Sequence, residues 1–252
     1  MPDLGGAWLN ATYFAALRKT HSPRQAHGCW GANGITEILI DPATRAGDSM
    51  AVALGVNNRE GMPLRYVHIR TGSNLRLTTY AREEANDGLL ATNLRYQTLN
   101  ADTLLFLDQR NPKTTRVVTT VFKRLQGVSG AGAALRSPPF QVALSQFVNS
   151  LDFRGTHLMT DSAGHECTVR FASDGTLQGF QRYRKYQVNT DFEGPFHEFD
   201  TVFFDIYQKT QHELAFAING DTIRLYTVHD DTATYKRQRG HLCYTLIRKS
   251  GK

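Results

Sequence analysis

The chain has 252 residues, 40 % of them hydrophobic, and a formal net charge of +6 at pH 7. This length suits one large domain or two small ones, and the apolar content is sufficient for a packed core. No run of about 20 apolar residues occurs, so the sequence predicts no membrane-spanning helix. The small basic excess favours acidic partners only weakly, and we interpret it as an ordinary solvated surface.

A strand and a helix are the first predicted elements. Residues 4–9 are typical of a short strand entered through glycines. Asn10 is a good helix N-cap, and the apolar spacing after it predicts a helix over residues 11–19. Ser22-Pro23 is expected to end that helix, because a residue that precedes proline avoids the helical conformation.

From residue 34 onward, short predicted strands recur at intervals of roughly 8–12 residues, a spacing typical of an antiparallel barrel or sandwich. Residues 126–138 are rich in small residues and predict a flexible linker. An amphipathic pattern predicts a helix over residues 139–151. The predicted strands are 34–40, 50–56, 64–70, 75–80, 89–99, 103–107, 116–122, 167–171, 177–188, 201–207, 214–218, 222–228 and 242–247.

One sequence pattern occurs twice. Residues 99–107 and 218–226 each contain an apolar residue, Asn, a small residue and Asp-Thr, followed by a strand-like run. Asn followed by Ala or Gly favours a tight hairpin turn. We therefore predict two similar β units, residues 1–125 and 153–252, joined by a linker and helix over residues 126–152. The two hairpins are expected at equivalent positions in these units.

The ends of each predicted unit resemble a known family. Residues 6–8, Gly-Ala-Trp, match the Gly-x-Trp with which lipocalins begin their first strand, whereas only Gly155 matches in the second unit. Each last strand ends on basic residues, at Arg124 and at Arg248. The chain thus resembles two tandem lipocalin-like (calycin) β-barrels. The resemblance implies that Trp8 is buried beneath Arg124 and that Arg248 closes the second barrel. The predicted fold class is therefore mainly β, with two antiparallel lipocalin-like units and two short helices; one larger barrel or sandwich built from both halves is the alternative.

The three cysteines, Cys29, Cys167 and Cys243, contain no Cys-x-x-Cys pair, so the sequence predicts no structural zinc site. Three His-Glu pairs lack the His-Glu-x-x-His spacing of zinc enzymes. Neither a Gly-x-Ser-x-Gly nucleophile motif nor a nucleotide-binding glycine motif occurs. We therefore expect no metal, no cofactor and no catalytic residue that a motif identifies.

Residues 182–186 interleave basic and aromatic side chains, a pattern that can stack on single-stranded nucleic acid. We interpret the stretch as an edge strand kept soluble by its charges and expect no specific nucleic-acid binding. No signal peptide is recognised. The chain is expected in the cytoplasm, or in the cell envelope or outside the cell if Met1 was placed on a trimmed mature form.

Three functions remain open. The first hypothesis is a non-catalytic binding protein that holds a small, apolar or amphipathic molecule in a barrel cavity, with Tyr66, His68 and Tyr183 as ligand-binding residues. The second is a structural or protein-interaction module of the cell envelope with filled barrels. The third is an enzyme with acid and base residues at a barrel mouth, which requires a pocket where a His lies within about 3 Å of a carboxylate or a Tyr. The ligand, the reaction and the oligomeric state are not specified.

Overall fold

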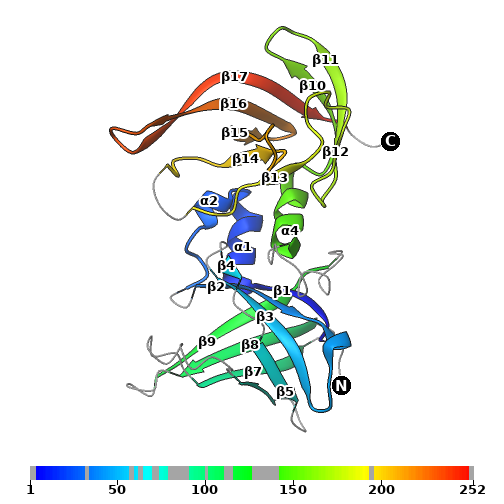
Figure 1. The fold of residues 1–252 in the computed structure, drawn as a ribbon, viewed down its shortest axis with the longest axis vertical. Helices are drawn as coiled ribbons and strands as arrows, with labels where there is room; N and C mark the ends of the chain where they lie inside the picture. The colour runs from blue at the N-terminus through cyan, green and yellow to red at the C-terminus, as the bar shows by residue number, and fades with distance from the viewer. Residues whose placement is uncertain are drawn as a thin grey trace. The chain divides into compact units, whose positions relative to one another are not determined.

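The fold was analysed on a computed structural model, which describes residues 4–31, 34–56, 60–61, 65–69, 74–78, 91–99, 102–110, 116–126, 142–192 and 196–249. The described chain is mainly β and contains two antiparallel sheets and three α-helices (Figure 1). The prediction of a mainly β, antiparallel protein is confirmed. The chain divides into an N-terminal unit, residues 1–16 and 28–144, and a C-terminal unit, residues 17–27 and 145–252.

The described helices are α1 (Ala11–Thr20), α2 (Pro23–Ala26) and α4 (Val142–Asp152). The carboxamide oxygen of Asn10 accepts two backbone N–H groups of the first turn of α1, at 3.0 and 3.2 Å, and so fixes the start of that helix. The expectation of only two helices was wrong, because Ser22 also caps a third. Its Oγ accepts the N–H of Gln25 at 3.0 Å, and Pro23 occupies the first turn, where no N–H donor is needed.

The N-terminal unit contains β1 (Gly6–Asn10), β2 (Ile35–Ile40), β3 (Ser49–Val56), β4 (Glu60–Gly61), β5 (Arg65–Ile69), β6 (Asn74–Thr78), β7 (Ala91–Leu99), β8 (Asp102–Arg110) and β9 (Val117–Arg124). These strands form one antiparallel sheet in the order β2-β1-β9-β8-β7-β6-β5-β3-β4. An additional pairing of β2 with β3 joins the two ends, so all strands except the short β4 form a closed circuit of neighbours. This is the connectivity of a small up-and-down barrel.

Aliphatic and aromatic side chains fill the inner face of this curled sheet. Val52 on β3 and Leu105 on β8 belong to one buried cluster, together with Trp8, Ile38 and Phe122. Because β3 and β8 lie on opposite sides of the strand circuit, their side chains meet across its interior. Residues two apart on a strand share a face, which explains why alternate positions of β2, β3 and β8 supply this core.

The C-terminal unit contains β10 (Gly155–Asp161), β11 (Glu166–Phe171), β12 (Leu177–Gln178), β13 (Tyr186–Val188), β14 (Thr201–Phe204), β15 (His212–Asn219), β16 (Thr222–Asp231) and β17 (Lys236–Arg248). Their antiparallel order is β12-β11-β10-β17-β16-β15-β14-β13. Thr176 and Lys185, which directly precede the edge strands β12 and β13, form an isolated bridge, and no ladder between these two strands is found in the described residues. Figure 1 shows β16 and β17 as the long curved hairpin of this unit.

The sequence predicted one long strand over residues 177–188, and this prediction was wrong. The chain leaves the strand at Gly179, whose φ is +79°. A Cβ at this position would lie 2.2 Å from the carbonyl oxygen of Thr168, so the close approach of the two backbones requires glycine. Residues 182–185 of the basic stretch therefore precede the edge strand β13, which begins at Tyr186. Its Arg182, Arg184 and Lys185 side chains are exposed.

In both units the first strand pairs with the second strand and with the last, and the two repeated sequences form hairpins at the same place, β7–β8 and β15–β16. The registers of these two hairpins nevertheless differ by one residue. In the first hairpin Asp102 pairs with Leu99, whereas in the second hairpin Thr222 pairs with Asn219 and Asp221 lies in the turn. Asp102 and Asp221 are thus not equivalent, because a shift of one residue moves a side chain to the other face.

Candidate functional site

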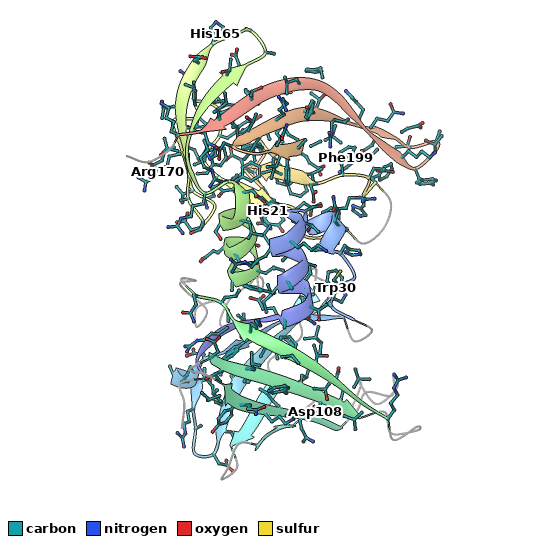
Figure 2. All side chains as sticks on the ribbon, turned by 180° about the vertical axis from the view of Figure 1, so that it is seen from behind. His21, Trp30, Asp108, His165, Arg170 and Phe199 are labelled. Atoms are coloured by element: carbon teal, nitrogen blue, oxygen red, sulfur yellow. The ribbon has the colours of Figure 1, made fainter. Side chains whose placement is uncertain are left out.

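An open cleft of about 630 Å³ lies on the C-terminal unit. Its lining combines the end of α1, the start of α2, the last residue of α4, the segment before β14, the end of β15 and one arginine of β17. Figure 2 labels two of the lining residues, His21 and Phe199, in this unit. The volume lies in the range of small-molecule sites, roughly 300–1,000 Å³.

A histidine and an aspartate meet in the cleft. Nδ1 of His21 lies 2.6 Å from Oδ1 of Asp152, and the two side chains are 50 % and 12 % exposed. Burial raises the pKa of Asp152, and the charge of Asp200 raises it further, while the hydrogen bond from His21 and the charge of Arg248 act in the opposite direction. Since Nδ1 faces the carboxylate, Nε2 is the ring nitrogen directed away from Asp152.

Neither His21 nor Asp152 is a residue type that its position at a helix end prefers. His21 directly follows α1 with φ +51°, a left-handed conformation that usually belongs to glycine at a helix C-terminus. Asp152 is the last residue of α4, where a negative charge opposes the helix dipole. Residues that break local rules without a local gain are often found at functional positions.

A second carboxylate of the cleft is held by the start of α2. Oγ of Ser22 donates to Oδ2 of Asp200 at 2.5 Å, and the backbone N–H of Arg24 donates to Oδ1 at 2.9 Å. Burial raises the pKa of Asp200, although these two hydrogen bonds and the charges of Arg24 and Arg239 favour its ionised form. Because the Ser22 hydroxyl donates to Asp200, it is not directed at His21.

The cleft also has apolar and cationic surface. Phe199, Phe216 and Ile218 contribute to its lining. The Cζ atom of Arg239 lies 5.4 Å from the ring centroid of Phe199 and 5.0 Å from that of Tyr226, so two aromatic faces hold this guanidinium in place. The site thus offers hydrogen-bonding groups, charges of both signs and aromatic carbon to one ligand.

Of the three ligand-binding residues predicted from sequence, the structure describes the side chain of Tyr183 alone. Tyr66 and His68 lie in β5, whose backbone is described but whose side chains lie outside the described residues. Tyr183 is 1 % exposed and stacks on Phe204 at 4.8 Å, within the aromatic core of the C-terminal unit. It is not one of the residues that line the cleft.

The closing residues implied by the lipocalin resemblance form a defined corner in the N-terminal unit. Trp8 is fully buried, and its Nε1 donates to the carbonyl of Leu4 at 3.0 Å. Arg124 is its partner on β9, with Cζ 5.8 Å from the indole ring, and the guanidinium donates to the carbonyl of Gly5. This is the arrangement that the resemblance implies for Trp8 and Arg124, and their role in closing a barrel stays a prediction.

The C-terminal unit repeats this corner with a histidine in place of the tryptophan. His157 is fully buried, and its Nε2 hydrogen-bonds the carbonyl of Phe153 at 2.9 Å, again four residues earlier in the chain. Arg248 is its partner on β17 and donates to the carbonyl of Asp152. The residue predicted to close the second barrel is therefore attached to the end of α4 that lines the cleft.

Sequence reasoning did not identify His21, Ser22, Asp152 or Asp200 as functional residues. Ser22 and Asp200 are 178 residues apart, so no motif could contain them all. A histidine two positions after the predicted helix, near the place where glycine is expected, was the available signal.

In the described part of the chain, no three His, Cys, Asp or Glu side chains are grouped as metal ligands. None of the described helices is long and apolar enough to cross a membrane. Comparison with protein-family models, with curated proteins and with solved structures found no match to this chain.

Proposed function

We propose that the chain binds a small amphipathic molecule in the cleft of its C-terminal unit. The cleft itself carries this proposal, since its volume of about 630 Å³ would accommodate a small ligand. The described core of the N-terminal unit, by contrast, is a continuous cluster of buried aliphatic and aromatic side chains. For this reason we place the ligand in the cleft and not inside a barrel.

The lining supports an amphipathic ligand. Phe199 and Ile218 provide carbon surface for an apolar part, while His21 and Arg239 provide charge and hydrogen-bond donors for a polar part. Placed polar groups of this kind orient a ligand in its site.

A lipocalin-like origin of both units belongs to this proposal. The closed circuit of strands in the N-terminal unit and the corner of Trp8 and Arg124 support it. The repeated corner of His157 and Arg248 supports the extension to the C-terminal unit.

The proposal can be tested by obstructing the cleft. Ala217 lines it, and Ala217→Trp should fill part of its volume. Ala163→Trp is the matched control, because Ala163 is exposed in the β10–β11 turn. Mass spectrometry of organic extracts and a thermal-shift screen of fatty acids, aromatic acids and aryl esters give two readouts. We expect the parent and Ala163→Trp to yield an extractable compound or to be stabilised by a compound of the screen. We expect neither result with Ala217→Trp. Equal binding by both variants would contradict the proposal.

An interaction module with filled barrels is the second candidate. The buried aliphatic and aromatic cluster among the described N-terminal residues favours it, as do exposed apolar side chains at Val117 and Val118 of β9 and at Leu242 and Ile247 of β17. A parent protein that yields no extractable compound and gives no thermal shift would favour this candidate over ligand binding.

A further inference from the structure

We propose that the cleft is catalytic and hydrolyses a carboxylic ester, with His21 as general base toward a water molecule and Asp152 as the residue that positions it. This inference rests on the proposed function, because the ester must first bind in the cleft. It adds a reaction to that function, and it assigns a role to a pair that a binding site alone does not require.

The geometry of the pair suits proton transfer. Asp152 is 12 % exposed and lies 2.6 Å from Nδ1 of His21, so the carboxylate fixes both the orientation and the tautomer of the ring. The imidazole is 50 % exposed, which leaves the opposite nitrogen, Nε2, accessible to a water molecule in the cleft. This satisfies the requirement of a His within about 3 Å of a carboxylate that we set for an enzyme.

The neighbouring side chains exclude a serine nucleophile within this arrangement. Ser22 follows His21 directly, but its hydroxyl donates to Asp200 and not to the imidazole. Water is therefore the nucleophile that His21 would activate. The His21–Asp152 pair is surrounded by further charged groups of the unit, namely Arg24, Glu198, Asp200, Arg239 and Arg248.

In the proposed reaction, the water oxygen bonds to the ester carbonyl carbon while Nε2 of His21 takes the water proton. The oxygen of the resulting tetrahedral intermediate carries the negative charge. When the intermediate collapses, the bond to the alcohol oxygen breaks, and the imidazolium returns its proton to that oxygen. The products are a carboxylic acid and an alcohol, and Asp152 remains ionised throughout.

The remaining lining supplies the other groups that ester hydrolysis requires. The guanidinium of Arg239, held over the ring of Phe199, can stabilise the negative oxygen of the intermediate. Phe199 and Ile218 offer carbon surface for an acyl or aryl group. Together with His21 and Asp152, these residues supply a base, an anion-stabilising cation and a site for the apolar part of the substrate.

The C-terminal unit contains a matched control. Nδ1 of His165 lies 3.0 Å from Oδ2 of Asp161, but this pair is on the surface, with an 81 % exposed imidazole. Figure 2 shows His165 near the tip of the β10–β11 hairpin, outside the cleft lining. If hydrolysis arises from any exposed histidine, substitution of either His21 or His165 should lower the rate. If it arises in the cleft, only substitution of His21 should lower the rate.

The experiment follows hydrolysis of p-nitrophenyl butyrate by the full chain and by His21→Gln and His165→Gln, after thermal unfolding confirms that each variant is folded. We expect His21→Gln to lose about 100-fold or more of the protein-catalysed rate and His165→Gln to keep it. A parent rate equal to that of buffer would overturn the proposal. So would a His21→Gln rate equal to that of the parent, or an equal loss in the control.

Asp152→Asn tests the positioning role. We expect kcat to fall while KM stays unchanged, because the amide no longer fixes the orientation and tautomer of the imidazole, with partial rescue by Asp152→Glu. A rise in KM with unchanged kcat, or no rescue by Asp152→Glu, would contradict the positioning role. The failure of catalysis is distinguishable from the failure of binding: if Ala217→Trp abolishes binding while His21→Gln leaves the rate unchanged, the proposed function stands and the catalytic inference falls.

Discussion

A single buried carboxyl should make the stability of the N-terminal unit strongly dependent on pH. Glu37 lies in β2 with a fully buried side chain. Burial raises its pKa from 4.5 to about 8, although the backbone of Leu144 favours the charged form. Neither carboxyl oxygen makes a hydrogen bond of normal geometry to a described residue. Glu37 is therefore protonated in the folded protein at pH 7 but ionised in the unfolded chain.

The sign and size of the effect follow from this difference. Between pH 4.5 and about 8 the folded state holds one proton more than the unfolded state. The free energy of unfolding should then fall by about 1.4 kcal/mol for each pH unit. The contribution is fully present below pH 4.5 and is lost as pH rises through about 8, a total of about 5 kcal/mol.

Glu37→Gln tests this reasoning, because the amide has a similar shape and does not titrate. Both tryptophans, Trp8 and Trp30, belong to the N-terminal unit, so indole fluorescence in urea reports its unfolding. We expect the stability of Glu37→Gln relative to the parent to rise by about 1.4 kcal/mol per unit between pH 5 and 8. Asp102→Asn, an exposed site at the start of β8, is the control. A Glu37→Gln difference that does not vary with pH would refute the argument.

Three further substitutions test other parts of the fold. Trp8→Ala should destabilise the N-terminal unit by roughly 3–5 kcal/mol, measured in urea through Trp30, and an unchanged midpoint would contradict a packed corner. Burial lowers the pKa of His157, so its contribution to stability is present above pH 6.5 and lost as pH falls below that value. The difference between the melting temperatures at pH 7.5 and pH 5 should therefore be smaller in His157→Phe than in the parent. Ser22→Ala removes the α2 cap and the hydrogen bond to Asp200, and the melting temperature should fall by an amount equivalent to about 1–2 kcal/mol; an unchanged melt would show that the cap is dispensable.

The sequence alone determined the local features of this protein. Regularly spaced β-rich segments with turn residues between them predicted the antiparallel sheets, because alternation and turn chemistry act over a few residues. Asn10 and the apolar spacing after it predicted α1 for the same reason, and the pattern of residues 139–151 predicted α4. Gly-x-Trp at residues 6–8 pointed to the buried Trp8.

Only the tertiary structure decided the contacts that join distant segments. The break at Gly179 depends on the backbone of Thr168, and the second role of Ser22 depends on Asp200. His21 and Asp152 are 131 residues apart, and each is unfavourable in its own helix end. A sequence pattern reports the preferences of neighbouring residues, whereas this cleft exists because strand pairing and core packing bring helix ends together. The mainly β, antiparallel fold class was therefore visible in the sequence, and the site was not.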